Sequence, residues 1–281
     1  IWYVLINYDL MKKKFFTALG AICIGLCYYF DLPFADVFRN IMAASSAATV
    51  VEGIEIPLSP EGVSERMLRR TNYTVSFNPD TNIPNWVAWS ITSDELIERE
   101  SRTDNFQPDP ALPPREAVTT ADYTRSGYDR GHMCPAADNR YHWRAMDESF
   151  YMTNICPQHH NLNAGAWSTL AQQCRSWASG NTIVHVVCGP ILYEGRTPRY
   201  IGSEHRVRVP DAFFKVVLYG YEQGNPRGIG SIFENKAGKK SLDHYACTIN
   251  EVERITGIDF FHLIPDSEEE KIEKRNSLPT L

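Results

Sequence analysis

The residues with the clearest capacity for chemistry stand together in the segment Asp129-Arg130-Gly131-His132. A histidine can accept a proton near neutral pH, and an arginine guanidinium can bind two phosphate oxygens at once. Gly131 permits a close backbone approach or an unusual turn, while Asp129 either orients His132 or Arg130 or makes a structural salt bridge. Hydrolysis of a phosphodiester needs a base, a cation and stabilisation of the leaving oxygen. The segment supplies a base and a phosphate anchor, but a lone histidine is more often structural.

A second candidate for this chemistry is Asn163, near the start of a helix expected over residues 162–178. Its amide oxygen can bind a hard cation such as Mg²⁺, which keeps most of its waters when the protein supplies few ligands. The alternative is that Asn163 caps the N-terminus of the helix. The adjacent pair His159-His160 is expected to belong to a polar loop, because neighbouring loop residues rarely chelate one ion.

The elements around these residues predict an α+β domain. Residues 73–77 and 86–91 have the composition of neighbouring antiparallel strands separated by turn residues. Four apolar residues fall on one face of the helix over 162–178; these are Trp167, Leu170, Cys174 and Trp177. Further strands are expected at 182–191, 206–209, 213–219 and 229–233. Strands and helices in no regular alternation favour the α+β class.

Three other segments complete this outline. Thr248 and Glu251 form a capping box for a helix that should end near Gly257. The charged run at 266–275 predicts a solvated end. The Pro-rich residues 101–127 predict a long functional loop, because they lead directly into the segment that carries His132. Trp143 and Trp167 are both expected in the core.

The composition is that of a globular protein: 281 residues, 43% of them hydrophobic and 22% charged. The formal net charge of −6 excludes a uniformly basic nucleic-acid coat. Any binding of a phosphate backbone must therefore come from a local patch. The candidates for such a patch are Arg140, Arg144, Arg196, Arg199, Arg206 and Arg208.

The N-terminal part has the features of an export signal. Met11 is followed by three lysines and then by a mostly apolar run from residue 15 to residue 30. We expect residues 1–45 to be an export signal or N-terminal anchor with a linker, and residues 46–281 to be the functional domain. The apolar run is short for a membrane span. The protein is therefore expected to be secreted or periplasmic, with no stable membrane association once the signal is cleaved; the alternative is a membrane-anchored protein.

Five of the seven cysteines lie outside the export segment. Export would permit disulfides, and an odd number leaves at least one thiol free or paired between chains. If two bridges form, Cys134–Cys156 and Cys174–Cys188 are candidate pairs, but spacing alone does not choose between pairings. The sequence contains no CxxC pair, so a structural zinc site is not expected.

Taken together, these segments resemble the DNA/RNA non-specific endonuclease family, which includes endonuclease G-like enzymes of the ββα-metal (His-Me finger) fold. The resemblance spans residues 70–265 and implies a central antiparallel sheet flanked by helices. The matching segments are Asp109-Pro110-Ala111-Leu112, Ala121-Asp122-Tyr123, Asp129-Arg130-Gly131-His132-Met133 with Pro135-Ala136-Ala137-Asp138, Asn154-Ile155-Cys156-Pro157-Gln158, Leu162-Asn163 through Trp167, Gly189-Pro190-Ile191-Leu192-Tyr193 and Val209-Pro210-Asp211-Ala212-Phe213-Phe214-Lys215.

By that resemblance, His132 would be the general base, and Asn163 would be the one direct protein ligand of a largely hydrated Mg²⁺, for which Mn²⁺ can substitute. Arg130 would contact phosphate, and Asn154 would support the site. An upstream arginine would stabilise the transition state; Arg102 is the candidate, and a plain surface arginine is the alternative. The implied reaction is sequence- and sugar-non-specific endonucleolytic hydrolysis of DNA and RNA, which are bound through their backbone phosphates.

One position departs from the family pattern. Ala171 stands eight residues after Asn163, where many relatives carry a glutamate that holds metal-bound water. Gln172 or Glu148 could substitute for it; otherwise metal affinity and rate should fall. Two alternatives to an active nuclease therefore stay open, a catalytically impaired nucleic-acid-binding relative and a hydrolase of small phosphoesters. The sequence is also compatible with a homodimer.

Overall fold

The computed structural model describes residues 51–180, 182–236 and 240–274. The predicted export segment, residues 1–45, lies outside the described residues. Within the described part of the chain, no helix is long and apolar enough to cross a membrane.

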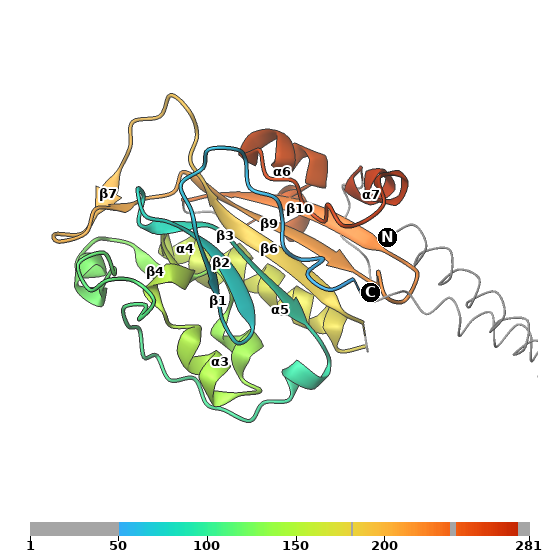
Figure 1. Cartoon of the computed structure of the whole chain (residues 1–281), viewed down its shortest axis with the longest axis horizontal. Coiled ribbons are helices and arrows are strands. Elements are labelled where there is room, and N and C mark those ends of the chain that lie inside the picture. Colours follow the sequence, from blue (N-terminus) through green and yellow to red (C-terminus); the bar gives the residue numbers. More distant parts are fainter. Residues whose placement is uncertain (1–50, 181, 237–239, 275–281) are drawn as a thin grey trace, which may run out of the picture. The chain divides into compact units, whose positions relative to one another are not determined.

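A seven-stranded antiparallel sheet forms the centre of this fold, in the order β1-β2-β3-β6-β9-β10-β11 (Figure 1). The predicted pairing of the first two strands is confirmed, because Tyr73 in β2 lies opposite Trp89 in β3. The strands are β1 (Arg66–Arg69), β2 (Tyr73–Asn78), β3 (Ile83–Ile91), β6 (Val184–Ile191), β9 (Ala212–Tyr219), β10 (Arg227–Glu234) and β11 (Ala246–Cys247).

Helices cover both faces of the sheet, with α5 on one side and α6 and α7 on the other (Figure 1). In β9, Phe213 and Val217 belong to the core beneath α5, whereas Phe214 and Val216 belong to the core beneath α6. One strand serves both cores because successive side chains point to opposite faces. The predicted α+β fold is therefore confirmed. The α-helices are α3 (Trp143–Glu148), α4 (His160–Leu162), α5 (Ser168–Ala178), α6 (Ile249–Thr256) and α7 (Asp266–Glu273).

The predicted limits of α6 are confirmed. The Thr248 side chain accepts a hydrogen bond from the Glu251 backbone N–H at 3.1 Å, and Gly257 ends the helix with a φ of +71°. The charged run predicted as a solvated end at 266–275 forms α7, most of whose side chains are at least partly exposed, whereas Ile272 and Glu273 are buried. Ile272 is 2% exposed and lies against Gly228 of β10, whose missing side chain leaves the space.

Two short ladders lie outside the central sheet. β4 (Asp129–His132) pairs with β5 (Ile155–Gln158), and β7 (Tyr200–Ile201) pairs with β8 (Val207–Arg208). The strand predicted at 206–209 is thus only two residues long. Single helical turns connect these parts; they are Asp94–Leu96, Thr120–Tyr123, Ala136–Asn139, Met152–Asn154 and Leu242–His244.

One sequence-based expectation about the core is wrong. Trp143 is 58% exposed, because it opens the short helix α3 on the surface, whereas Trp167 is buried as predicted. The five cysteines in the described residues are all free, so neither Cys134–Cys156 nor Cys174–Cys188 is bridged. Four of these thiols pack in the apolar core as small hydrophobic groups, and burial raises the pKa of Cys188 to about 12.

Candidate active site

Three of the residues predicted to do chemistry, Arg130, His132 and Asn163, lie in a unit of two strands and a helix, whereas Arg102 lies in the loop that precedes this unit. β4 ends at His132, and β5 continues into α4, a π-helical turn at Asn163–Trp167 and then α5. In the β4–β5 register, His132 lies opposite Ile155 and Asp129 lies opposite Gln158. The sequence predicted a single helix over 162–178, but the structure interrupts it at Gly165, whose backbone is not helical.

Gly131 lies in tight contact with β5, as the sequence predicted. A Cβ atom at this position would stand 2.6 Å from Gln158 Cβ, closer than real Cβ contacts allow. The side chain of Gln158 is fully buried and cannot move into solvent. We therefore expect Gly131→Ala to force β4 and β5 apart and to lower the free energy of unfolding by about 1–3 kcal/mol.

Urea unfolding of Gly131→Ala checks this expectation. Gly180→Ala is the matched control, because a Cβ there meets no atom within 4 Å. Equal unfolding midpoints for the two variants would contradict the steric role of Gly131.

The His132 ring is enclosed by aromatic side chains. Its centroid is 5.2 Å from that of Phe106 and 5.0 Å from that of Phe150. The Nε2 atom is buried and has no hydrogen-bond partner among the described residues. Burial, followed by the nearby Arg102 guanidinium, lowers the pKa of His132 to about 3. The imidazole is therefore neutral at pH 7, which is the form that can accept a proton.

Asn154 fixes the chain just beyond His132. Its Oδ1 accepts from the Cys134 backbone N–H at 2.9 Å, and its Nδ2 donates to the carbonyls of Cys134 and Ser149 at 2.9 and 2.8 Å. The side chain is fully buried and lines neither of the pockets described below. Its contacts are those of a positioning residue, which holds the end of β4 in place.

Trp167 ties the helix to β4. Its Nε1 donates to the His132 carbonyl oxygen at 3.0 Å. The Lys215 ammonium of β9 lies 4.0 Å from the Trp167 ring centroid and is fully buried, a cation–π contact in a desolvated setting. The sequence did not predict this role for Lys215, because strand and helix are far apart along the chain.

Asn163 is held by Asp129. Its Nδ2 donates to Asp129 Oδ2 at 2.9 Å, which leaves the carbonyl oxygen Oδ1 as an acceptor. The same carboxylate oxygen lies 2.8 Å from His160 Nδ1. Asn163 has helical backbone angles, and His159 caps the helix instead. The N-cap alternative for Asn163 is therefore wrong. Asp129 contacts Asn163 and His160, whereas the orienting role predicted for it concerned His132 or Arg130.

Two connected pockets surround these residues, since Arg130 and Asn163 line both. The inner pocket, about 240 Å³, is lined among others by Arg102, Arg130, His132, Asn163, Ala171 and Arg175. The outer pocket, about 490 Å³, is lined among others by Phe106, Thr120, Tyr123, Tyr128, Asp129 and Asn163. The structure thus brings four of the five predicted site residues to one pocket, and Asn154 behind it.

Both arginines lie over the aromatic rings that enclose His132. The Arg102 guanidinium is 5.1 Å from the Phe150 ring centroid, and that of Arg130 is 4.2 Å from the Phe106 ring centroid. Arg102 also donates to Asp104 at 2.7 Å and remains half-exposed. These contacts direct two positive charges at the pocket that contains the histidine.

Arg175 is a pocket residue that the sequence analysis missed. Asn163, Trp167, Ala171 and Arg175 all line the inner pocket, and their spacing of four places them on one helix face. That spacing was the signal that could have found Arg175. Its guanidinium is paired with Asp138 at 2.6 Å.

The possible metal ligands in the inner pocket suit a hard cation that keeps its water shell better than one that is bound by several protein side chains. Asn163 Oδ1 is a neutral oxygen ligand, and no carboxylate lines this pocket. In the described residues, no three His, Cys, Asp or Glu side chains form a cluster that could hold a metal ion. A cation bound here would keep most of its waters, which is the behaviour of Mg²⁺.

Gln172 and Glu148, the possible substitutes for the glutamate that Ala171 replaces, differ in their distance from the inner pocket. Glu148 accepts from the Thr71 backbone N–H at 2.6 Å and does not line the inner pocket. Gln172 donates to Ser168 at 3.2 Å, and Ser168 does line the pocket. Glu148 is therefore not placed to replace the carboxylate that Ala171 lacks, whereas Gln172 is adjacent to the pocket wall.

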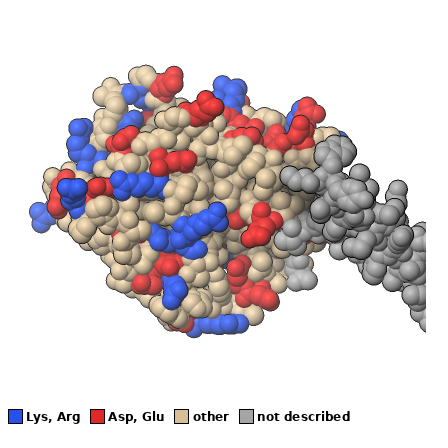
Figure 2. Space-filling view, in the orientation of Figure 1, with Lys and Arg blue, Asp and Glu red and all other residues tan. Residues whose placement is uncertain are grey.

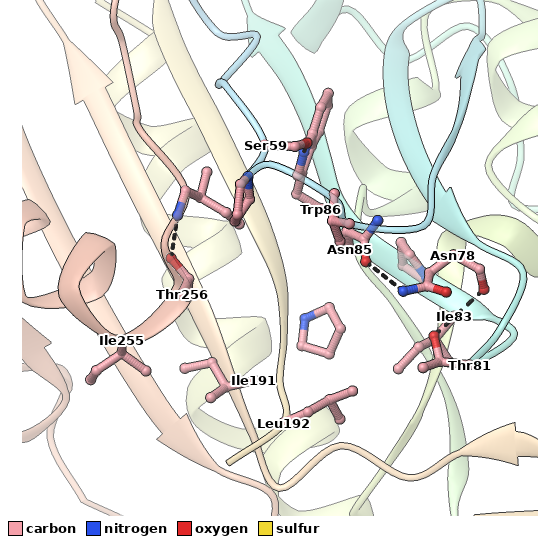
Figure 3. Close-up of a pocket in the computed structure, with 15 residues that line it drawn as sticks. Ser59, Asn78, Thr81, Ile83, Asn85, Trp86, Ile191, Leu192, Ile255 and Thr256 are labelled. Atoms are coloured by element: carbon pink, nitrogen blue, oxygen red, sulfur yellow. Dashed lines mark hydrogen bonds between the residues drawn. The ribbon is translucent and has the colours of Figure 1, made fainter. Parts of the chain in front are cut away.

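A further cavity of about 250 Å³ lies between the ends of β3, β6 and α6 (Figure 3). Its lining includes Trp86, Ile191 and Ile255, and none of its lining side chains is acidic or basic. Hydrogen bonds within its wall join Asn78 to Asn85 and Ile258 to Thr256. Without a titratable group it offers no acid–base chemistry, so the candidate site is the pair of pockets around Asn163.

The comparisons with known proteins agree with this site. Residues 52–267 match the family model described as DNA/RNA non-specific endonuclease, so the chain belongs to that family. It is 30% identical to a nuclease of Serratia marcescens, over 86% of this chain and 93% of that protein. It is 31% identical to the mitochondrial nuclease EXOG of Mus musculus, over 77% of this chain and 61% of that protein.

The fold is also similar to that of a solved structure. The chain matches one from the EndoG/EndoGI complex, a structure described as showing the mechanism of EndoG inhibition, with a TM-score of 0.65 and 27% identity. The match covers 72% of this chain and 87% of that chain. The ββα-metal nuclease fold expected from the sequence is thus confirmed.

Proposed function

We propose that this chain is a Mg²⁺-dependent endonuclease that hydrolyses DNA and RNA phosphodiesters without sequence or sugar specificity. The observation that carries the proposal is the inner pocket, where the neutral imidazole of His132 shares one cavity with Asn163 and two predicted arginines. Membership of the family supports a nucleic-acid substrate. The names of the relatives, which are nucleases, support a hydrolytic reaction.

Each predicted residue has a defined part in this proposal. The His132 imidazole, which lines the inner pocket, accepts the proton of the attacking water. Arg130 and Arg102 bind the non-bridging phosphate oxygens and offset the negative charge that develops. Asn163 Oδ1 would hold Mg²⁺, or Mn²⁺ in its place. A cation held there would neutralise negative charge on the phosphate and on the leaving oxygen.

Metal dependence tests the proposed function directly. The purified chain is incubated with supercoiled plasmid and with structured RNA, in Mg²⁺, Mn²⁺, Ca²⁺ or EDTA. We expect both polymers to be cut in Mg²⁺ or Mn²⁺, and EDTA to lower the rate by about 100-fold or more, with recovery when Mg²⁺ is restored. No cleavage of either polymer in any metal would refute the proposal.

The second candidate function, a nucleic-acid-binding relative with impaired catalysis, is favoured by Ala171. This residue lines the inner pocket at the position where a carboxylate would face the cation's waters. Loss of such an outer contact typically costs 10–100-fold in metal affinity or activity. DNA binding without cleavage in the natural chain, together with cleavage by Ala171→Glu, would decide for the binding protein.

Localisation stays a prediction. The segment on which secretion or periplasmic export rests lies outside the described residues, as does the alternative membrane anchor. Relatives include proteins named as mitochondrial nucleases, and those names describe the relatives. The homodimer is likewise untested.

A further inference from the structure

A short basic arm borders the outer pocket. We define the basic arm as residues 199–208, which contain β7, β8 and the turn between them. Tyr200 pairs with Arg208, and Ile201 pairs with Val207. In Figure 1 this ladder projects from the central sheet at the end of the molecule where β4 lies. The arm carries three arginines and one glutamate, although the whole chain is acidic.

The turn of the arm is fastened to the wall of the outer pocket. His205 is 7% exposed, and its Nδ1 lies 2.9 Å from Asp122 Oδ2. The backbone N–H of His205 donates to Asp122 Oδ1 at 3.0 Å. Asp122 belongs to the helical turn Thr120–Tyr123, whose ends line the outer pocket. Gly202, with a φ of +94°, allows this tight turn.

A second contact connects the strand side of the arm to the same pocket. The Arg199 guanidinium donates to the Tyr128 hydroxyl at 3.0 Å, and Tyr128 lines the outer pocket beside Asp129. Two independent contacts therefore set the position of the arm relative to Asn163. An arm fixed in this way can bind a ligand that extends out of the pocket at little cost in ordering.

The exposed side chains of the arm suit a nucleic-acid strand. Tyr200 is 40% exposed, and the Arg206 guanidinium lies 4.2 Å from its ring centroid. Among the described residues, neither Arg199 nor Arg206 is paired with a carboxylate, whereas Arg208 is buried beside Asp211. Unpaired guanidinium groups bind phosphates, and an exposed aromatic ring stacks on bases without regard to sequence.

The charge distribution on the surface agrees with this reading. Figure 2 shows several Lys and Arg side chains, with acidic ones interspersed, at the end of the molecule where Figure 1 places β7. By contrast, Arg196 just before the arm lies 3.8 Å from both Asp211 and Glu234. Arg199 and Arg206 of the arm thus add to the positive charge that Arg130 brings to the outer pocket.

We propose that the basic arm binds the nucleic-acid strand beyond the phosphate that is cut, with Arg199 and Arg206 on backbone phosphates and Tyr200 stacked on a base. The proposal rests on the proposed function for the nature of the polymer. On this proposal, the arm increases the affinity of the protein for long strands. It has no effect on the hydrolysis of short phosphodiesters.

Binding is measured without cleavage, in a full-length His132→Ala background, by fluorescence anisotropy of a labelled 30-nucleotide strand. We expect Arg199→Ala/Arg206→Ala to raise Kd about tenfold or more and to reduce the slope of log Kd against log salt by about 1.4, which is about 0.7 for each phosphate contact of a single strand. Tyr200→Ala is expected to raise Kd about fivefold or more. Arg254→Ala/Lys274→Ala is the matched control, because it removes two exposed cations from α6 and the end of α7.

Cleavage assays with His132 intact separate this proposal from the proposed function. The arm variants should raise KM for long DNA and leave kcat for bis(p-nitrophenyl) phosphate unchanged. If the arm variants bind and cut like the control pair, the arm is not a binding surface, whatever the enzyme does. If the natural chain binds DNA through the arm but cuts nothing, the arm proposal stands and the nuclease proposal fails.

Discussion

Replacing His132 with alanine is expected to lower kcat on plasmid DNA by about 100- to 10,000-fold, the usual contribution of a general base. The reason is the position of its imidazole, which lines the inner pocket together with Asn163 and Arg130. With a pKa of about 3, the ring remains neutral at pH 7, so the base is present in its active form. Single-turnover cleavage measured at saturating protein checks the expected loss.

The controls distinguish lost chemistry from lost structure. Removing the ring leaves a cavity between Phe106 and Phe150, so His132→Gln is made alongside, and thermal melting shows whether each variant is folded. Added imidazole should restore part of the activity of His132→Ala by entering that cavity. His244→Ala removes an exposed histidine from the turn Leu242–His244 and should cut normally. A His132→Ala variant within tenfold of the natural rate would exclude this residue as the base.

The framework of the fold follows from local patterns in the sequence. Residues 73–77 and 86–91 have strand composition and are separated by turn residues. They form the neighbouring antiparallel strands β2 and β3. The end of α6 was predictable from Thr248 and Gly257, because capping depends on neighbours in sequence. α7 was not, since its docking depends on the space above Gly228, which lies far away along the chain.

The same division applies to the candidate site. His132, Asn163 and Arg130 were recognisable from residue type and family-like spacing, and they do share a pocket. The packing of Phe106 and Phe150 around His132, which makes the ring a desolvated base, joins three separate segments. No local pattern encodes such a contact. Sequence therefore indicated which residues could do the chemistry, while tertiary packing determines the state in which they do it.

The hydrogen bond between Asp129 and Asn163 shows how packing prepares a residue for its chemistry. A neutral amide is a weak ligand by itself, but one that is fixed by a hydrogen bond at 2.9 Å loses little freedom when it binds a cation. The buried Trp167–Lys215 contact holds the helix against β4 in the same way. A site with a single protein ligand thus depends on the residues around that ligand for its geometry.

Asn163→Ala is therefore expected to abolish specific Mg²⁺ binding and to lower kcat by about 100-fold or more, while leaving the fold intact. The substitution removes one half-exposed side chain whose hydrogen bond to Asp129 also lies at the pocket. Mn²⁺ binding is measured directly by calorimetry, so the result does not depend on activity. Asn161→Ala is the matched control, because Asn161 is exposed on the same helix and lines neither pocket.

Mn²⁺ binding by Asn163→Ala and Asn161→Ala shows whether Asn163 is the metal ligand. If Asn163 holds the cation, Asn161→Ala binds Mn²⁺ like the natural chain, and Asn163→Ala shows no specific binding. Retained Mn²⁺ affinity in Asn163→Ala would place the cation elsewhere, with Asp129 as the nearest carboxylate to examine. Because Ala171 already removes one outer contact from this site, little else in the inner pocket can compensate for the loss of the amide. The effect of Asn163→Ala should accordingly be close to complete.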